Sequence, residues 1–192
     1  MKLIEKLKLM SLMGLLLHAT ACHPKTPQRP KPVAVVAEAA LPNGTTVDLA
    51  IIGFNYTDRY INAFSVDGNG GGNLSVSSAS GGGGGSACCA VYTTGDPAPE
   101  ISVRWQSDAC TYHTRYDKGG NEFNDIYSIY TTKTVNVTSI SPNPKYLEIH
   151  IFPNGRVEAA ITGELSSPRV VLDQNRDTDA PFRKCPNDKR PE

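Results

Sequence analysis

The stretch that decides the fold of this chain is residues 53–92, GFNYTDRYINAFSVDGNGGGNLSVSSASGGGGGSACCAVY. Two apolar runs, 47–54 and 61–66, lie on either side of a short polar segment, which is the pattern of two short strands joined by a turn. Two glycine clusters follow. Glycine loses much conformational entropy on ordering, so this segment folds only where its ends are pinned. The adjacent Cys88 and Cys89 begin the next apolar run and are placed to pin one end. We therefore expect two strands, a long glycine-rich loop and a strand with a disulfide anchor.

Beyond this stretch, apolar and polar residues alternate with the period of two that indicates half-buried strands. The clearest example is 101–106, which places Trp105, the only tryptophan, on the core side. A Pro-Asn-Gly motif at 153–155 separates two further alternating runs and is a strong hairpin signal. Segment 122–130 is ambiguous and fits a short helix, whereas 131–137 is rich in β-branched residues and predicts a strand.

Strands of this number and length predict a single all-β domain over 33–165, either an antiparallel β-sandwich or a partly open barrel with a long glycine-rich loop. No long stretch after the first residues has helical periodicity. From 166 onward the chain is polar and contains prolines. We expect the tail, 166–192, to stay disordered unless Cys185 staples it back to the domain.

The first 21 residues have the pattern of a targeting segment. Lysines occupy the start, and an apolar run at 9–17 follows that is too short to span a bilayer. The sequence Ala-Thr-Ala-Cys at 19–22 resembles a bacterial lipobox, which predicts cleavage before Cys22 and attachment of acyl chains to it. The alternative is a secreted protein that is cut at the same bond and is not lipidated.

Residues 22–32 form a proline-rich, basic tether in this interpretation, holding the domain about 30 Å from the membrane. His23 stands where an aspartate would resemble the inner-membrane retention signal of enteric lipoproteins. The absence of an aspartate here predicts that the lipoprotein is anchored on the periplasmic side of the outer membrane.

Charge and cysteine content narrow the function classes. The chain has 19 basic and 19 acidic residues. Removal of residues 1–21 takes away three lysines and one glutamate, which leaves 16 basic and 18 acidic residues and argues against nucleic-acid binding. Export favours disulfides among the remaining cysteines, Cys88, Cys89, Cys110 and Cys185. Of the three possible pairings, we expect Cys88 and Cys89 to pair with Cys110 and Cys185 rather than with each other.

No catalytic or metal-binding arrangement stands out. The chain lacks a G-x-S-x-G nucleophile elbow, and its glycine clusters lack the Gly-Lys-Ser/Thr ending of a phosphate-binding loop. His113 and His150 stand alone, and no C-x-x-C pair supports a zinc site. We expect no cofactor, no metal and no small-molecule substrate, and we treat the protein as a non-enzyme. A hydrolase remains the minority alternative.

Several unusual blocks occur in order along the chain: GFNYTDRYI at 53–61, FSVDG at 64–68, the glycine run into the paired cysteines, Val-Arg-Trp at 103–105 and IFPNGRV at 151–157. Together they resemble a domain-of-unknown-function family of proteobacterial lipoproteins over about 49–161. Some members of that family are periplasmic immunity proteins that protect the producer from type VI secretion phospholipase effectors. The resemblance therefore implies an effector toxin as partner. The alternative is a structural envelope lipoprotein without a toxin partner.

Loops on a rigid scaffold often hold function, so the turn at 55–60 and the glycine loop are the candidate contact surfaces. The residues predicted to touch a partner are Tyr56, Asp58, Arg59, Tyr60, Asp67 and Asn69.

Overall fold

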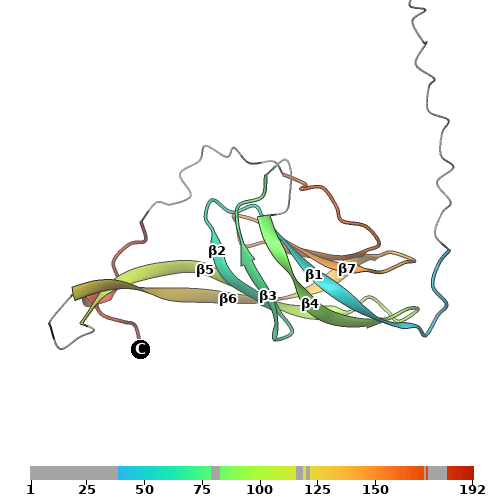
Figure 1. The fold of residues 1–192 in the computed structure, drawn as a ribbon, viewed down its shortest axis with the longest axis horizontal. Helices are drawn as coiled ribbons and strands as arrows, with labels where there is room; N and C mark the ends of the chain where they lie inside the picture. The colour runs from blue at the N-terminus through green and yellow to red at the C-terminus, as the bar shows by residue number, and fades with distance from the viewer. Residues whose placement is uncertain (1–38, 79–82, 116–118, 120–121, 171, 173–180) are drawn as a thin grey trace, which may run out of the picture. The chain divides into compact units, whose positions relative to one another are not determined.

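The computed structural model describes residues 39–78, 83–115, 119, 122–170, 172 and 181–192. Eight strands and one short 3₁₀ turn follow one another along them (Figure 1). They are β1 (Thr46–Asn55), β2 (Ile61–Val66), β3 (Asn69–Leu74), β4 (Gly83–Thr93), β5 (Glu100–Arg115), β6 (Glu122–Ile140), β7 (Tyr146–Ile151), β8 (Val157–Thr162) and η1 (Pro186–Asp188). No helix in this described part is long and apolar enough to cross a membrane. The expected export segment 1–21, the lipidated Cys22 and the tether 22–32 lie outside the described residues.

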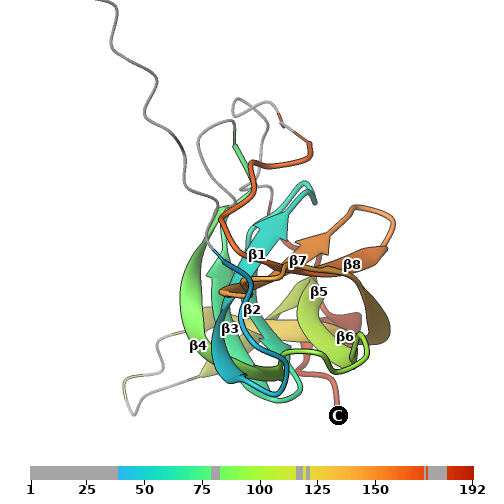
Figure 2. The same cartoon turned by 90° about the vertical axis from the view of Figure 1, so that its right-hand side faces the viewer.

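The strands form one mixed sheet that is nearly closed into a barrel, in the order β1-β4-β3-β2-β5-β6-β8-β7, with β7 returning to β1 (Figure 2). This confirms the all-β prediction and selects the barrel over the sandwich. In the described part of the chain two of the strand pairings are short: β3 pairs with β4 at Leu74 and Gly84, and β6 pairs with β8 at two residue pairs. The sheet is not purely antiparallel, because β1 and β7, and also β6 and β8, run parallel. The alternation of apolar and polar residues along a strand shows which side chains face the core, but it does not show whether the neighbouring strands run parallel or antiparallel.

The core lies inside the barrel and follows the predicted alternation. Trp105 is 3% exposed, and Leu49, Ile51 and Ile149 are buried with it. The strands β7 and β8 form the predicted hairpin, with Ile151 paired to Val157 across the turn.

The glycine clusters are not one long loop. Residues 70–72 belong to β3, and residues 83–85 begin β4. The reason is visible at Gly71, where a Cβ would collide with the ring of Phe64 on the neighbouring β2. Absence of a side chain here lets the ring pack across the strand. The prediction of a loop was wrong for these residues, and 79–82 lie outside the described part.

Segment 122–130 is strand, not helix, because it pairs with β5 residue by residue. The two strands continue past the barrel as a two-stranded arm, with Asp108 to Arg115 opposite Glu122 to Ile129 (Figure 1). A bulge at Ser107 marks where the arm begins.

The expected cysteine pairing is wrong. The sulfurs of Cys110 and Cys185 are bonded, with 4.9 Å between their Cα atoms, and those of Cys88 and Cys89 are joined to each other. The physical reason is the strand order: β3 and β2 stand between β4, which has Cys88 and Cys89, and β5, which has Cys110. Cys185 fastens the end of the tail to the arm through its bond to Cys110, which is the stapling expected for the tail. Residues 173–180 of the tail lie outside the described part.

Candidate functional site

A cavity of about 170 Å³ opens where β1 ends, β2 begins and β7 turns into β8. Its walls come from three places that are far apart in the sequence and from one residue of the tail. They are the turn after β1, the bulged part of β5 with Thr131 beside it on β6, and the β7–β8 turn, with Phe182 from the tail. Concave surfaces built from loops on a rigid barrel are the usual places for binding.

The turn after β1 is shaped by the buried side chain of Asn55. Its Nδ2 donates to the carbonyl oxygens of Arg59 (2.7 Å) and Leu74 (3.2 Å), and its Oδ1 accepts from the backbone N–H (2.9 Å) and the hydroxyl (2.7 Å) of Thr57. The side-chain amide of Asn55 therefore holds the turn together and ties it to Leu74 at the end of β3. The arrangement fixes the backbone from 55 to 60 and directs Asp58 and Tyr60 outward.

The β7–β8 turn forms the facing wall. Gly155 has φ +70°, a conformation that glycine adopts at little cost, and its N–H donates to the carbonyl oxygen of Phe152 (3.0 Å). The side-chain oxygen of Asn154 accepts from the N–H of Arg156 (2.9 Å). The Pro-Asn-Gly sequence therefore both closes the hairpin and holds this wall in place.

Two arginines lie over aromatic rings at this end of the barrel. The guanidinium carbon of Arg59 is 5.0 Å from the ring centroid of Phe182, and that of Arg156 is 3.8 Å from the ring centroid of Phe152. Tyr60 adds an aromatic ring that is 42% exposed. Tyrosine, tryptophan and arginine are the side chains enriched at protein-binding hot spots.

The predicted contact residues fall into three groups. Asp58, Arg59 and Tyr60 line the cavity. Tyr56 is 1% exposed and lies beneath this surface rather than on it.

The other two predicted contacts, Asp67 and Asn69, are exposed at the far end of β2, about 20 Å away by strand rise. The Oδ1 of Asp67 accepts from the N–H of Ser102 (2.8 Å), and this bond ties the β2–β3 turn to β5. The structure therefore does not bring these two residues to the cavity.

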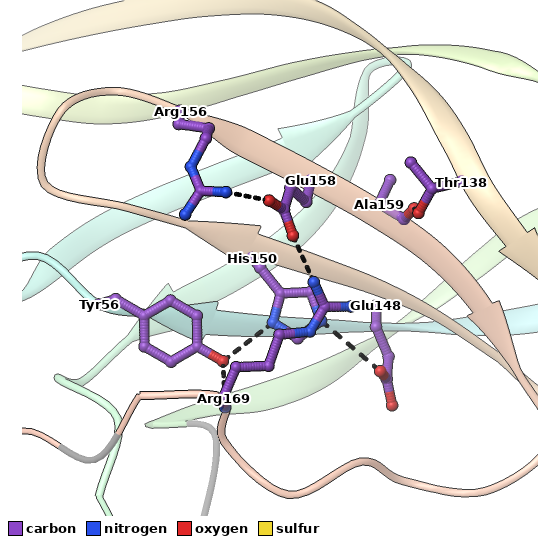
Figure 3. Close-up of polar contacts among 8 residues, drawn as sticks. All are labelled: Tyr56, Thr138, Glu148, His150, Arg156, Glu158, Ala159 and Arg169. Atoms are coloured by element: carbon purple, nitrogen blue, oxygen red, sulfur yellow. Dashed lines mark hydrogen bonds and ion pairs between the residues drawn. The ribbon is translucent and has the colours of Figure 1, made fainter.

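Sequence reasoning missed a buried polar row on the outer face of β1 and β7 (Figure 3). The hydroxyl of Tyr56 lies 3.0 Å from Nδ1 of His150, and Nε2 of His150 faces Oε2 of Glu148 at 3.7 Å. His150 and Glu148 are both fully buried. The only sequence signal is that Glu148 and His150 alternate with Leu147 and Ile149, a pattern that predicts a solvent-facing polar side.

The row is buried because residues 163–170 cross over it (Figure 2). We call this segment the strap. The backbone N–H of Ser166 donates to Oε1 of Glu148 (2.8 Å), and that of Arg169 donates to the hydroxyl oxygen of Tyr56 (2.9 Å). At the surface the guanidinium of Arg169 pairs with Glu158, which also binds Arg156 (Figure 3).

Burial alone would raise the pKa of Glu148, but the neighbouring His150 and the hydrogen bonds from Ser166 lower the pKa to about 2. Burial raises the pKa of the Tyr56 hydroxyl, so it stays protonated and can donate to His150. A hydroxyl, an imidazole and a carboxylate in series have the order of a nucleophile, its base and the base's orienting group. Here the hydroxyl oxygen is occupied by the Arg169 N–H, and the row fastens the strap to the barrel.

No group of three or more His, Cys, Asp or Glu side chains placed to hold a metal ion occurs within the part of the chain that is described.

The fold and these features define a small, disulfide-crosslinked β-barrel protein with a concave surface at one end. Residues 54–159 match the family described as "Protein of unknown function (DUF3304)", and the chain belongs to this family. The match lies inside the stretch 49–161 over which the sequence resembles a family of unknown function, and it contains both turns that face the cavity. Neither the curated proteins nor the solved structures provide a match.

Proposed function

We propose that this protein is a lipid-anchored binding protein of the periplasm that neutralises a type VI secretion phospholipase effector. One observation carries the proposal that it acts by binding. Residues 57–59 of the Tyr-Thr-Asp-Arg block lie far in sequence from the Phe-Pro-Asn-Gly block, yet they line the same cavity as Phe152, Pro153 and Gly155 of that block. Both blocks are among those on which the resemblance to immunity-containing lipoproteins rests.

The side chains at this surface support a protein partner. Tyr60 is exposed beside the cavity, and the guanidinium groups of the two arginines lie over the rings of Phe182 and Phe152. Arginine held in this way is pre-organised, so a bound partner need not order it again. The Asn55 network and the β7–β8 turn keep both walls rigid, which further reduces the entropy lost on binding.

The opening is small compared with a protein interface. A tight inhibitor of a secreted toxin needs a Kd of about 1 nM, which corresponds to roughly −12 kcal/mol. An interface of standard size buries about 1,600 Å² in total. The cavity would therefore accept one side chain of the effector at the centre of a larger contact that includes Asp58 and Tyr60.

Inhibition can be measured directly. The probe is a type VI secretion phospholipase effector from the bacterium that makes this protein, acting on vesicles of phosphatidylethanolamine and phosphatidylglycerol. The purified full-length chain should abolish fatty-acid release at about one equivalent. Full hydrolysis at a tenfold excess of the chain would refute the proposal.

The site is tested with matched variants. Tyr60→Ala and Arg59→Glu should each raise the amount of chain needed for inhibition at least tenfold. Asp48→Lys, which changes an exposed charge on β1 away from the cavity, should inhibit like the unaltered chain. Equal inhibition by all three variants would place the contact elsewhere. A strain that lacks the gene should be killed by sibling cells that deliver the effector.

A further inference from the structure

Among the described residues, no strand lies beside the outer edge of β6 over most of its length. Along 124–136 one edge of β6 pairs with β5, and β8 joins the other edge only at Val137 and Ile140. No strand of the described residues pairs with the remaining outer edge. An open edge of this length is a template for pairing with another chain.

Backbone contacts show which residues point to this edge. Thr111 on β5 gives its N–H to Arg183 and accepts from the N–H of Cys185, so both its backbone groups point away from β6. Its cross-strand partner Ile126 must then point its own N–H and C=O to the outer edge. Val137, an odd-numbered residue, donates to Pro99 on the β5 side. Even-numbered residues of β6 therefore present the open hydrogen-bonding groups.

The charges along this edge are self-complementary. Between 124 and 136 the sequence has two charged residues, Asp125 and Lys133, each four positions from Ile129. Both are odd-numbered, so they share one face of the sheet. When two copies of β6 pair antiparallel with Ile129 opposite Ile129, Asp125 of each copy stands opposite Lys133 of the other copy.

The same alignment satisfies the backbone. It sets Ile126 opposite Thr132 and Ser128 opposite Tyr130. All four are even-numbered residues whose backbone N–H and C=O groups point to the outer edge, so they can form hydrogen bonds between the two copies. The two charge pairs then fall at the positions without hydrogen bonds, where opposing Cα atoms come within about 4.5 Å. β-Branched and aromatic residues dominate the remaining pairs, which suits cross-strand contact.

We propose that two copies of this chain associate through β6, antiparallel about Ile129, to make one sheet that continues from β5 to β6 and on into the β6 and β5 of the second copy. The contact is isologous, so every residue pair except Ile129 with Ile129 on the axis occurs twice, and the assembly closes as a dimer.

In a single copy, the side chain of Asp125 occupies one of the open backbone groups of this edge. Its Oδ1 accepts from the N–H of Ile126 (2.8 Å), and its Oδ2 accepts from the hydroxyl of Tyr112 (2.9 Å). In the dimer Thr132 of the second copy takes over the Ile126 N–H, and Asp125 turns to Lys133. A lysine on an edge strand usually opposes pairing with another strand. Here Asp125 of the second copy stands opposite Lys133, so the charge of the lysine is matched in the dimer.

The test uses light scattering on the purified full-length chain. The unaltered chain should be a dimer, and Asp125→Lys and Lys133→Asp should each be monomeric, because each sets like charges opposite each other. An equimolar mixture of the two variants should form a heterodimer, because two lysines then face two aspartates. A monomeric unaltered chain at every concentration would overturn the proposal, and so would variants that dimerise as well as it does.

Two further variants separate pairing from folding. Ile126→Pro removes an N–H that points away from β5, so it should abolish the dimer while circular dichroism still reports the native sheet. Asp48→Lys on β1 should leave the dimer intact. A fully dimeric Ile126→Pro variant would show that the contact lies elsewhere.

Discussion

The ring of His150 stacks on the ring of Phe54 across the parallel β1–β7 pair, with 4.5 Å between centroids and 14° between planes. This contact seals one side of the imidazole, and the strap covers the row from outside. The hydroxyl of Tyr56 accepts from the backbone N–H of Arg169 and is hydrogen-bonded to Nδ1 of His150. Nε2 of His150 then faces the carboxylate of Glu148. The geometry of the row is thus determined by groups from β1, β7 and the strap together.

Replacement of His150 by phenylalanine should destabilise the fold by about 2–4 kcal/mol. The ring would still stack on Phe54, but the buried Tyr56 hydroxyl would lose its hydrogen-bond partner and the buried Glu148 carboxylate would lose its neighbour. Urea unfolding measures the change. Tyr56→Phe removes only the hydroxyl and should cost less, about 1 kcal/mol. Equal stability of the His150→Phe variant and the unaltered chain would contradict this account.

Stability should fall in acid because of Glu148. Its pKa is about 2 in the folded protein against an ordinary value of 4.5. Since the folded value is the lower one, the stabilisation is present above about pH 4.5 and is lost as the pH falls towards 2, by about 3 kcal/mol in total. Urea unfolding at pH 7, 4 and 3 tests this. A Glu148→Gln variant should be less stable at pH 7 and should have a flatter profile in this range.

Gly71→Ala should destabilise the barrel by about 1–3 kcal/mol, because the new methyl group would meet the Phe64 ring. Gly70→Ala is the matched control on the same strand, since a Cβ there has no neighbour within 4 Å. Thermal unfolding of the two variants should differ clearly. Similar losses in both would mean that backbone entropy, and not the ring, sets the cost.

Removal of the Cys110–Cys185 bond by Cys185→Ser should cost about 4 kcal/mol in the chain-entropy model, since the bond spans 75 residues. The released tail should then be cut by trypsin at Arg183 and Lys184, which the bond and the bridge from Thr111 to Lys184 hold on the arm. Mass spectrometry of timed digests measures the cutting rate. If the oxidised unaltered chain were cut at the same rate, the tail would not be held by this bond.

The alternation around Trp105 and Ile149 and the Pro-Asn-Gly turn were enough to predict the all-β class, because each is a local pattern along one strand. Direction and order of the strands were not predictable in this way. Cys88 and Cys110 are near each other in sequence, yet two strands separate β4 from β5. Segment 122–130 has no local signal that excludes a helix, and its pairing with β5 decides that it is a strand.

The sequence by itself determined the β-barrel's faces, its hairpin and the turn residues Asp58 to Tyr60, because periodicity and turn chemistry depend on near neighbours. Only the tertiary structure decided that Glu148 and His150 are buried, because the strap that covers them comes from a separate part of the chain. It also decided that Gly71 belongs to a strand, through the Phe64 ring that needs the space. Burial and pairing depend on residues distant in sequence, and local patterns do not encode those contacts.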